Sequence, residues 1–169
     1  MKVLGIDPGS INCGYGLILC EKQEAGPVAL KYLSSGRIIM PAAKPLCIRL
    51  RELFTSLMDV IGEYEPDEVA TEKIFFAKGT KAALSLGHTR GVILLAATMR
   101  DIPIYEYSAL EVKKAVVGYG RADKNQVQKM VGKILKINHT LSSDSADALA
   151  LALCHANIKK MKLKAGNRK

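Results

Sequence analysis

Apolar residues open the chain in three short runs that are separated by turn-forming residues. The runs are KVLGI at 2–6, GYGLILCEKQ at 14–23 and VALKYLSSGRIIM at 28–40, and their aliphatic and β-branched residues are typical of strands. Asp-Pro-Gly-Ser at 7–10 and Glu-Ala-Gly-Pro at 24–27 are good turn sequences. Because short links usually join neighbouring antiparallel strands, the pattern predicts an antiparallel meander.

The period of the apolar residues then lengthens. From about Lys44, leucines recur every three or four residues, which predicts an amphipathic helix. The later segments alternate in kind: a strand at 66–77, an alanine-rich helix at 78–100, a strand at 102–107, and helices at about 109–116, 123–135 and 143–158. Helices that separate the later strands indicate an α/β domain, with a five-stranded mixed sheet flanked by helices.

The composition fits a single domain with a basic end. The 169 residues are 49% hydrophobic and 24% charged, which suits one domain with a buried core. The net charge is +9, but residues 159–169 hold six Lys or Arg and no acid, so the rest carries +3 (9 minus 6). We expect a domain over residues 1–158 and a basic, disordered tail over 159–169 that contacts phosphates nonspecifically. A purely solubilising end is an equal alternative.

Nothing in the sequence predicts contact with a membrane. The longest apolar run, VILLAATM at 92–99, is too short to span a bilayer. Asp7 and Pro8 interrupt the apolar start too early for a secretory leader. We therefore expect a cytoplasmic protein without a membrane partner.

Two acidic residues belong to predicted strands. Asp7 ends the first strand, and Glu72 lies on the strand at 66–77. Each has a simpler interpretation than chemistry, because an aspartate serves a turn well and a strand glutamate can face water. If the strand at 66–77 returns parallel to the first strand across a helix, however, the two carboxylates emerge close together.

Two more acids, Asp144 and Asp147, stand at the start of the last predicted helix. Their spacing of three places both on one helical face. The simpler interpretation is capping, by Ser142, Ser143 or Asp144, with Asp147 complementing the helix dipole.

Taken together, these acids predict a metal site. A final helix packed on the sheet would aim its two carboxylates at the same point as Asp7 and Glu72. Four gathered carboxylates repel one another and need a cation. Oxygen ligands without His or Cys suit Mg²⁺ or Mn²⁺.

Five motifs in this order and spacing resemble one known family. They are GIDPGSxxxGYG at 5–16, TEKIFFAKG at 71–79, LGHTRGVILLAA at 86–97, EVKKAVVGYGRADKNQVQKMV at 111–131 and SDSADALALA at 143–152. Each motif alone is weak, but the set is similar to the bacterial Holliday-junction resolvase family RuvC over residues 1–158.

The resemblance implies a ribonuclease H-like fold, a homodimer, and nicking of two strands of a four-way DNA junction in recombination and repair. It implies 5′-phosphate and 3′-hydroxyl products, and it implies that the RuvA–RuvB branch-migration machinery is a partner. It places the catalytic, metal-binding acids at Asp7, Glu72, Asp144 and Asp147. These would hold two Mg²⁺ ions per site, with Mn²⁺ as a substitute.

The resemblance also points to residues that contact DNA. It matches Phe75 to a phenylalanine that wedges against bases near the crossover, a role that suits apolar insertion into unstacked steps. The alternative is that Phe75 and Phe76 are both core residues. It assigns Lys113 and Lys124 to phosphates, and the same basic cluster includes Lys114 and Arg121, with Lys78 a weaker candidate.

The helix at 78–100 carries small residues every four positions, at Ala83, Gly87 and Gly91. Such a stripe permits close approach either to the helix's own sheet, which is the commoner case, or to another helix. The resemblance implies that this helix forms part of the dimer. An isologous dimer would match the near two-fold geometry of a junction.

Three rival interpretations stay open from the sequence. An actin-like nucleotide-binding domain shares the first motif, but it needs a second such domain that 169 residues do not contain. A ribonuclease H-like nuclease acting on RNA or duplex DNA would use the same acids. The third rival is a DNA-binding module without catalytic activity, which the complete set of acids disfavours.

Overall fold

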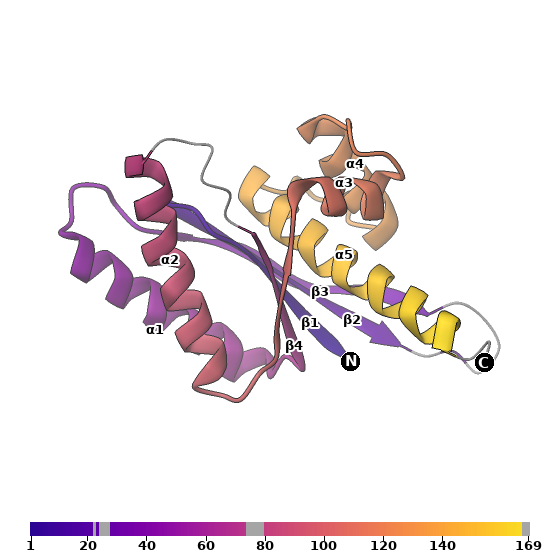
Figure 1. Ribbon diagram of the computed structural model, residues 1–169, viewed down its shortest axis with the longest axis horizontal. Helices are drawn as coiled ribbons and strands as arrows, with labels where there is room; N and C mark the ends of the chain where they lie inside the picture. Colours follow the sequence, from indigo (N-terminus) through magenta and orange to yellow (C-terminus); the bar gives the residue numbers. More distant parts are fainter. Residues whose placement is uncertain (22, 24–27, 74–79, 167–169) are drawn as a thin grey trace.

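The computed structural model describes residues 1–21, 23, 28–73 and 80–166. Its elements follow the predicted order (Figure 1). The strands are β1 Lys2–Asp7, β2 Asn12–Glu21, β3 Ala29–Ile39, β4 Glu68–Glu72 and β5 Ile104–Tyr107. The helices are α1 Leu46–Tyr64, α2 Thr80–Thr98, α3 Ala109–Val117, α4 Lys124–Leu135 and α5 Ser143–Gly166.

The five strands form one mixed sheet in the order β3-β2-β1-β4-β5. Strands β1, β2 and β3 pair antiparallel, whereas β4 is parallel to both β1 and β5. The register places Asp7 opposite Gly14 on β2 and Ile6 beside Thr71 on β4. The predicted α/β class, the mixed sheet and the antiparallel meander are confirmed, and the condition for bringing Asp7 and Glu72 together is met because β4 lies parallel to β1.

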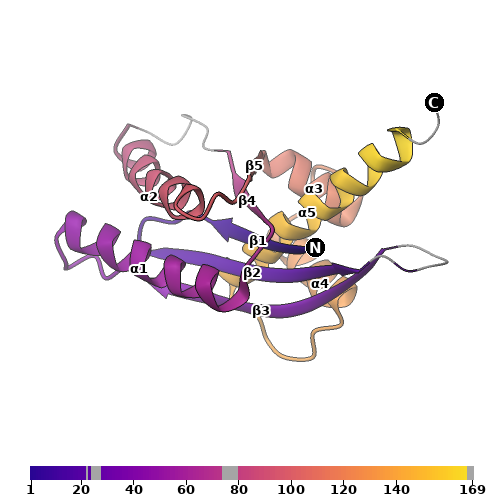
Figure 2. The same cartoon turned by 90° about the horizontal axis from the view of Figure 1, so that it is seen from below.

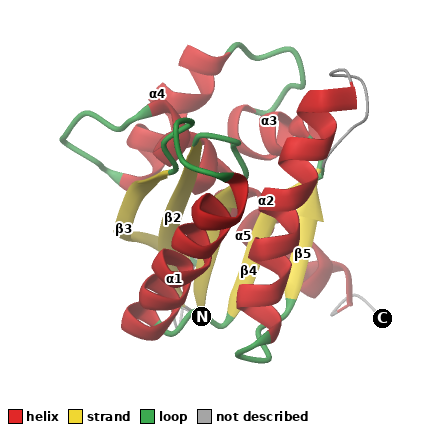
Figure 3. Ribbon diagram, turned by 90° about the vertical axis from the view of Figure 1, so that its left-hand side faces the viewer, coloured by secondary structure: helices red, strands yellow, loops and turns green. Residues whose placement is uncertain are grey.

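Helices cover both faces of the sheet. Helices α1 and α2 lie on one side, and α5 with α3 and α4 lies on the other (Figure 1, Figure 2); Figure 3 looks onto the α1 and α2 side. Alternation along β1 feeds two separate cores, because Leu4 and Ile6 pack toward α1 and α2 whereas Val3 packs toward α5. Asp7 is four residues after Val3 on the same strand, so its side chain points to the same face, the one covered by α5.

The last helix is longer than predicted. We expected it to end near Ile158, but α5 continues to Gly166, so that prediction is wrong. Two physical reasons favour the extension: Lys, Met, Leu and Ala are good helix formers, and the Lys159 ammonium is paired with Glu68 on β4. The division of the chain into a domain and a tail at residue 158 stays a prediction. Among the described residues, no helix combines the length and apolar character needed to cross a bilayer.

Candidate active site

Asp7 and Glu72 close two adjacent parallel strands at the same edge of the sheet. Ile6 on β1 is the register partner of Thr71 on β4. Asp7 and Glu72 are the next residues on the two strands. A buried hydrogen bond from the Thr71 hydroxyl to the Ile6 carbonyl, 2.9 Å long, ties the two strands at this point. The shared edge therefore brings both carboxylates to one place.

The turn after Asp7 is held from the opposite side of the sheet. Arg49 on α1 donates a hydrogen bond to the carbonyl of Ser10. Thr89 on α2 donates one to the carbonyl of Gly9 at 3.2 Å. The Asp-Pro-Gly-Ser segment is thus a turn, as its composition predicts, and both helices fix the backbone that carries Asp7.

Helix α5 brings the other two acids. The backbone N–H of Ser145 donates to the Ser142 hydroxyl at 3.2 Å, so Ser142 caps the helix. The carboxylates of Asp144 and Asp147 face cations instead: Asp144 lies 3.8 Å from Arg37 on β3, and Asp147 lies 2.6 Å from the Lys124 ammonium. Ser142 is therefore the helix cap, and capping does not account for Asp144 or Asp147.

Glycines on the strands let α5 sit against the sheet. A Cβ on Gly5 would stand 1.9 Å from the carbonyl oxygen of Ala148, and one on Gly14 would stand 2.1 Å from that of Asp144. No side chain fits in those spaces. The crowding of glycines around the first turn therefore has a cause that sequence reasoning missed, which is direct contact between α5 and the strands.

Gly5→Ala should consequently destabilise the protein. The added methyl group meets backbone atoms that cannot rotate away, so α5 must shift, and overpacking of this kind typically costs about 1–3 kcal/mol or more. We expect a lower melting temperature. Gly132→Ala on α4 is the matched control, because a Cβ there meets nothing within 4 Å. An unchanged melting temperature in Gly5→Ala would contradict the close contact.

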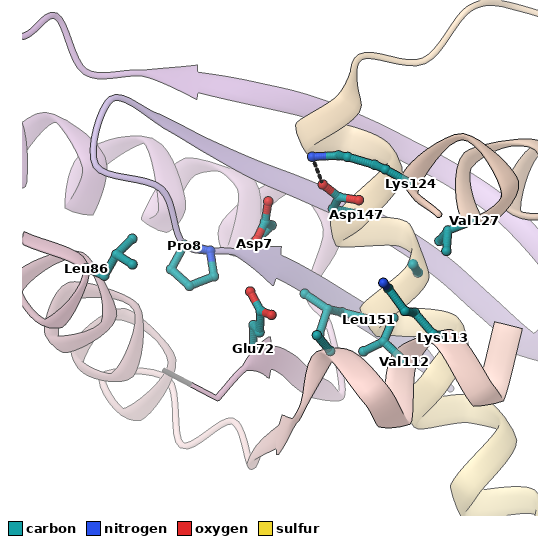
Figure 4. Close-up of a pocket in the computed structure, with 12 residues that line it drawn as sticks. Asp7, Pro8, Glu72, Leu86, Val112, Lys113, Lys124, Val127, Asp147 and Leu151 are labelled. Carbon is teal, nitrogen blue, oxygen red and sulfur yellow. Dashed lines mark ion pairs between the residues drawn. The ribbon is translucent and has the colours of Figure 1, made fainter. Parts of the chain in front are cut away.

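A cavity of about 410 Å³ opens at the meeting point of these elements (Figure 4). Three of the four predicted acids line it, namely Asp7, Glu72 and Asp147, together with Lys113 and Lys124. The remaining lining residues are Pro8, Leu86, Ala109, Val112, Val127, Ala150 and Leu151. Asp144 does not line the cavity, and its carboxylate pairs with Arg37 instead.

The acids affect one another electrostatically. Burial, reinforced by the charges of Asp147 and Glu72, raises the pKa of Asp7 from 3.8 to about 7, and Asp144 adds to the same effect, whereas Lys124 opposes it. Burial also raises the pKa of Asp147 despite the hydrogen bond from Lys124. A pocket that resists the loss of its carboxyl protons is one that favours an added cation.

The donor set suits a hard divalent ion, although the acids are not drawn together around one. Within the described part of the chain, no three acidic, histidine or cysteine side chains are close enough to hold a metal ion as they stand. The Lys124 ammonium is paired with Asp147 at 2.6 Å. Carboxylate oxygens are the ligands that Mg²⁺ and Mn²⁺ prefer, so the residues fit such an ion in kind and location.

Two capping boxes place the pocket lysines. Ser108 and Glu111 bond reciprocally to start α3, and Asp123 and Gln126 do the same for α4. Lys113 therefore follows on the second turn of α3, and Lys124 is the first residue of α4. Asp123 is accounted for as a cap.

The other predicted DNA contacts lie elsewhere. Lys114 and Arg121 are exposed and are not among the residues that line the cavity. Phe75 and Lys78 lie outside the described residues, as does Phe76. Gly118 and Gly120 serve the local fold: Gly118 ends α3 with a φ of 95°, and a Cβ on Gly120 would stand 2.2 Å from Leu110.

The small-residue stripe of α2 faces away from the sheet. Gly87 and Gly91 are exposed, and a Cβ on either would meet nothing within 4 Å. Burial of this stripe against the sheet, which we took as the commoner case, is therefore wrong. Leu84 and Leu95 on the same helix are 63% and 52% exposed, so the helix presents apolar surface beside the glycines.

Comparisons with known proteins agree on one family. Residues 3–155 match the family described as crossover junction endodeoxyribonuclease RuvC. A relative of that name from Syntrophomonas wolfei is 47% identical over 156 residues, which cover 92% of this chain and 88% of the relative. The structure of Thermus thermophilus RuvC is similar with a TM-score of 0.86 and 32% identity, covering 96% of this chain and 97% of that one. A second Thermus thermophilus RuvC structure, in complex with a Holliday junction substrate, is similar with a TM-score of 0.85, 30% identity, and coverage of 95% and 96%.

Proposed function

The chain belongs to the RuvC family of crossover junction endodeoxyribonucleases, and from this premise we propose that it resolves four-way DNA junctions by paired, metal-dependent hydrolysis of phosphodiester bonds. The observation that carries the proposal is the cavity in which Asp7, Glu72 and Asp147 meet beside Lys113 and Lys124. Acids for a cation and lysines for a phosphate, side by side, suit phosphodiester hydrolysis. The products carry 5′-phosphate and 3′-hydroxyl ends, as recombination and repair require for resealing.

The four acids are proposed as the catalytic, metal-binding residues. Asp7 and Glu72 hold ions from the sheet, while Asp147 and Asp144 hold them from α5, with two Mg²⁺ ions per site and Mn²⁺ as a substitute. When bound, such ions lower the pKa of water and stabilise the charge on phosphoryl oxygens. Metal loading requires Asp147 to exchange its Lys124 partner for an ion and Asp144 to turn from Arg37.

The basic residues are proposed to hold the DNA. Lys113 and the released Lys124 are placed to neutralise phosphate oxygens next to the acids. Lys114 and Arg121, exposed outside the cavity, contact flanking phosphates. Phe75, as a wedge between bases, and Lys78 stay predicted contacts on the segment that follows β4.

The direct test is incubation with a synthetic four-way junction and Mg²⁺. We expect two nicks at symmetric positions, both of which a DNA ligase reseals. Matched duplex DNA and an RNA–DNA hybrid, incubated in parallel, should stay intact. Cleavage of either control at the rate of the junction would favour a general ribonuclease H-like nuclease, and no cleavage of any substrate with Mg²⁺ or Mn²⁺ would refute the proposal.

We propose that the active protein is a homodimer formed through α2. The stripe of Gly87 and Gly91, flanked by exposed Leu84 and Leu95, supports this assignment. Small residues permit two helices to approach closely, and the leucines supply apolar area to bury. Two sites related by a two-fold axis would cut the two strands symmetrically.

Gly91→Arg should therefore convert the protein to a monomer. The Cβ meets nothing within 4 Å in the protomer, and replacing a helical glycine raises helix propensity by up to about 1 kcal/mol, so the protomer keeps its fold. We expect monomers in sedimentation at micromolar concentration and loss of paired nicks. Gly62→Arg on α1, equally free of neighbours, should stay dimeric. A dimeric Gly91→Arg protein would exclude this face.

Two further assignments follow from the family. We propose that the RuvA–RuvB branch-migration machinery is a partner at the junction. We also propose that the protein acts in the cytoplasm, where bacterial chromosomes lie.

A further inference from the structure

A buried hydrogen-bonded chain joins α5 to two strands. The imidazole of His155 lies 2.6 Å from the Tyr107 hydroxyl through Nδ1 and 2.6 Å from a Glu68 carboxylate oxygen through Nε2. His155 is 2% exposed and Glu68 is 8% exposed. Lys159, one turn further along α5, pairs with the other oxygen of Glu68. The aromatic ring of Tyr105 lies 4.5 Å from the imidazole, centroid to centroid.

The two groups that flank His155 have different hydrogen-bonding roles. Burial would raise the pKa of Glu68, but hydrogen bonds from Lys159 and His155 outweigh it and lower that pKa below its usual value, so Glu68 is a charged acceptor. Burial raises the pKa of Tyr107 well above its usual value, so its hydroxyl keeps a proton to donate. In the neutral imidazole, Tyr107 then donates to Nδ1 while Nε2–H donates to Glu68.

Helix α5 crosses the sheet: its first turns lie over β2 and β3, near Gly14 and Gly36, whereas His155, midway along the helix, reaches Glu68 on β4. Glu68 opens β4 and meets His155 in the second half of α5, whereas Glu72 closes β4 and shares the cavity with Asp147 in the first turns of α5. Glu68 and Glu72 lie on the same face of the strand because their spacing is even. Figure 1 shows α5 beginning near α3 and α4 and running over the sheet toward the end where β1 begins.

The two contacts on α5 are a short distance apart. From His155 to Asp147 a helix covers roughly 12 Å, at about 1.5 Å per residue. A contact that fixes His155 against Glu68 therefore limits where Asp147 can lie relative to the ends of β1 and β4.

Helix α5 contacts the sheet over several stretches. At its start the Ser145 hydroxyl donates to the Gly36 carbonyl on β3 at 3.1 Å, and further along Ala148, Leu149 and Ala152 pack against the strand glycines Gly5 and Gly16. Apolar contact is non-directional, whereas hydrogen bonds impose direction and distance. The chain of Glu68, His155 and Tyr107 is thus a directional contact between α5 and the parallel strands β4 and β5.

We propose that His155 is a positioning residue of the nuclease site, which acts with Glu68 and Tyr107 to fix the placement of α5 on β4 and β5 and thereby the separation of Asp147 from Glu72 and Asp7. This inference rests on the proposed function. Misplacement of catalytic groups by about 1 Å can cost on the order of 100-fold in rate. Loosening this distant contact should therefore reduce nicking without weakening the grip on DNA.

The test compares three variants of graded severity. His155→Phe removes both imidazole hydrogen bonds, Tyr107→Phe removes one, and His155→Gln offers an amide that can accept and donate in their place. For His155→Phe we expect nicking at saturating junction to fall by roughly 10-fold to 100-fold, a higher Mg²⁺ concentration for half-maximal rate, and an unchanged dissociation constant for the junction. The nicking rates and the Mg²⁺ requirements of Tyr107→Phe and His155→Gln should lie between those of His155→Phe and those of the wild type.

Tyr32→Phe is the matched control. It also removes a hydroxyl whose hydrogen bond, 3.1 Å to Ser35 within β3, does not involve α5, and we expect its Mg²⁺ dependence to be that of the wild type. The double variant Tyr107→Phe with His155→Phe should be no worse than His155→Phe alone, because the two links act as one unit. If His155→Phe only lowers the melting temperature, and nicks below that temperature with the wild-type Mg²⁺ dependence, the chain is structural and the proposal is overturned.

Calorimetric titration with Mn²⁺ in the absence of DNA separates this inference from the proposed function. We expect His155→Phe to bind Mn²⁺ several-fold more weakly than the wild type and Tyr32→Phe to bind it equally. A wild-type protein that binds Mn²⁺ but leaves junctions intact would refute the proposed function alone. Equal Mn²⁺ binding by the wild type and His155→Phe would refute the positioning role.

Discussion

Asp7→Asn is expected to abolish junction nicking while junction binding stays at the wild-type level. Asp7 stands at the centre of the electrostatic group, since burial, Asp147, Glu72 and Asp144 all act on its carboxyl. An amide has the same shape but no charge to hold an ion. Loss of several kcal/mol of charge stabilisation should reduce the nicking rate by a factor of roughly 1,000 or more. A gel-based nicking assay with a parallel binding titration measures both quantities.

The same variant should be more stable than the wild type without metal. The pKa of Asp7 is about 7 in the folded protein against a usual value of 3.8, so between these values the folded protein binds a proton that the unfolded chain does not. Wild-type stability therefore falls as the pH rises through this window, and the full cost is present above it. Asparagine carries no charge, so it does not destabilise the folded protein in this way. With a chelator present to remove metal, the melting temperature of the variant should exceed that of the wild type at about pH 8 and approach it at about pH 4.

Asp59→Asn supplies the control for both measurements. Asp59 is exposed on α1, away from the cavity, and its replacement should change neither nicking nor the pH dependence of the melting temperature. Wild-type nicking by Asp7→Asn would remove Asp7 from the mechanism. If the melting temperature of Asp7→Asn has the same pH dependence as that of the wild type, the Asp7 carboxylate does not destabilise the folded protein.

Lys124→Met is expected to change nicking and metal binding in opposite directions. The Lys124 ammonium lies 2.6 Å from Asp147 and also stabilises the charged form of Asp7. An entering divalent ion must replace it, so removing the ammonium eliminates a competitor and makes the cavity more negative. Nicking should nevertheless fall, by about 100-fold, because a phosphate then lacks its proposed cation.

Solvent screening limits how much the Mn²⁺ affinity of Lys124→Met can rise. The Lys124 side chain is 59% exposed and that of Asp147 is 29% exposed, so screening reduces the pair well below its unscreened strength. We expect Mn²⁺ affinity to rise by about 10-fold or less at low salt, measured by calorimetry. Lys129→Met, an exposed lysine on the same helix α4, should leave Mn²⁺ affinity unchanged. Weaker Mn²⁺ binding in Lys124→Met would mean that the lysine supports the ion site.

The elements of this fold were predictable because their signals are local. Residues Lys2 to Met40 carry strand composition between turn sequences, and the leucines after Lys44 repeat with the helical period. Backbone preference and amphipathicity act over a few residues at a time, so a single sequence reports them. The end of α5 was missed because Lys159 is held by Glu68, a contact between residues far apart in the chain.

The candidate site was only partly predictable. The positions of Asp7 at a strand end, of Glu72 on a strand and of Asp147 at the start of a helix are features of the sequence, whereas the end of β4 at Glu72 is seen only in the structure. That these three line one cavity while Asp144 turns to Arg37 depends on how closely α5 approaches the strand glycines. The outward direction of the α2 stripe likewise depends on which side of that helix meets the sheet.

By itself, then, the sequence determined the order of strands and helices, the identity of the acids and the family. Only the tertiary structure decided that β4 returns parallel beside β1, that Lys124 neutralises Asp147, that glycines bring α5 onto the sheet, and that His155 joins Glu68 and Tyr107. The physical reason is range. Periodicity and turn chemistry are properties of neighbouring residues, whereas ion pairs, close packing and buried hydrogen bonds depend on where distant segments of the chain come to rest.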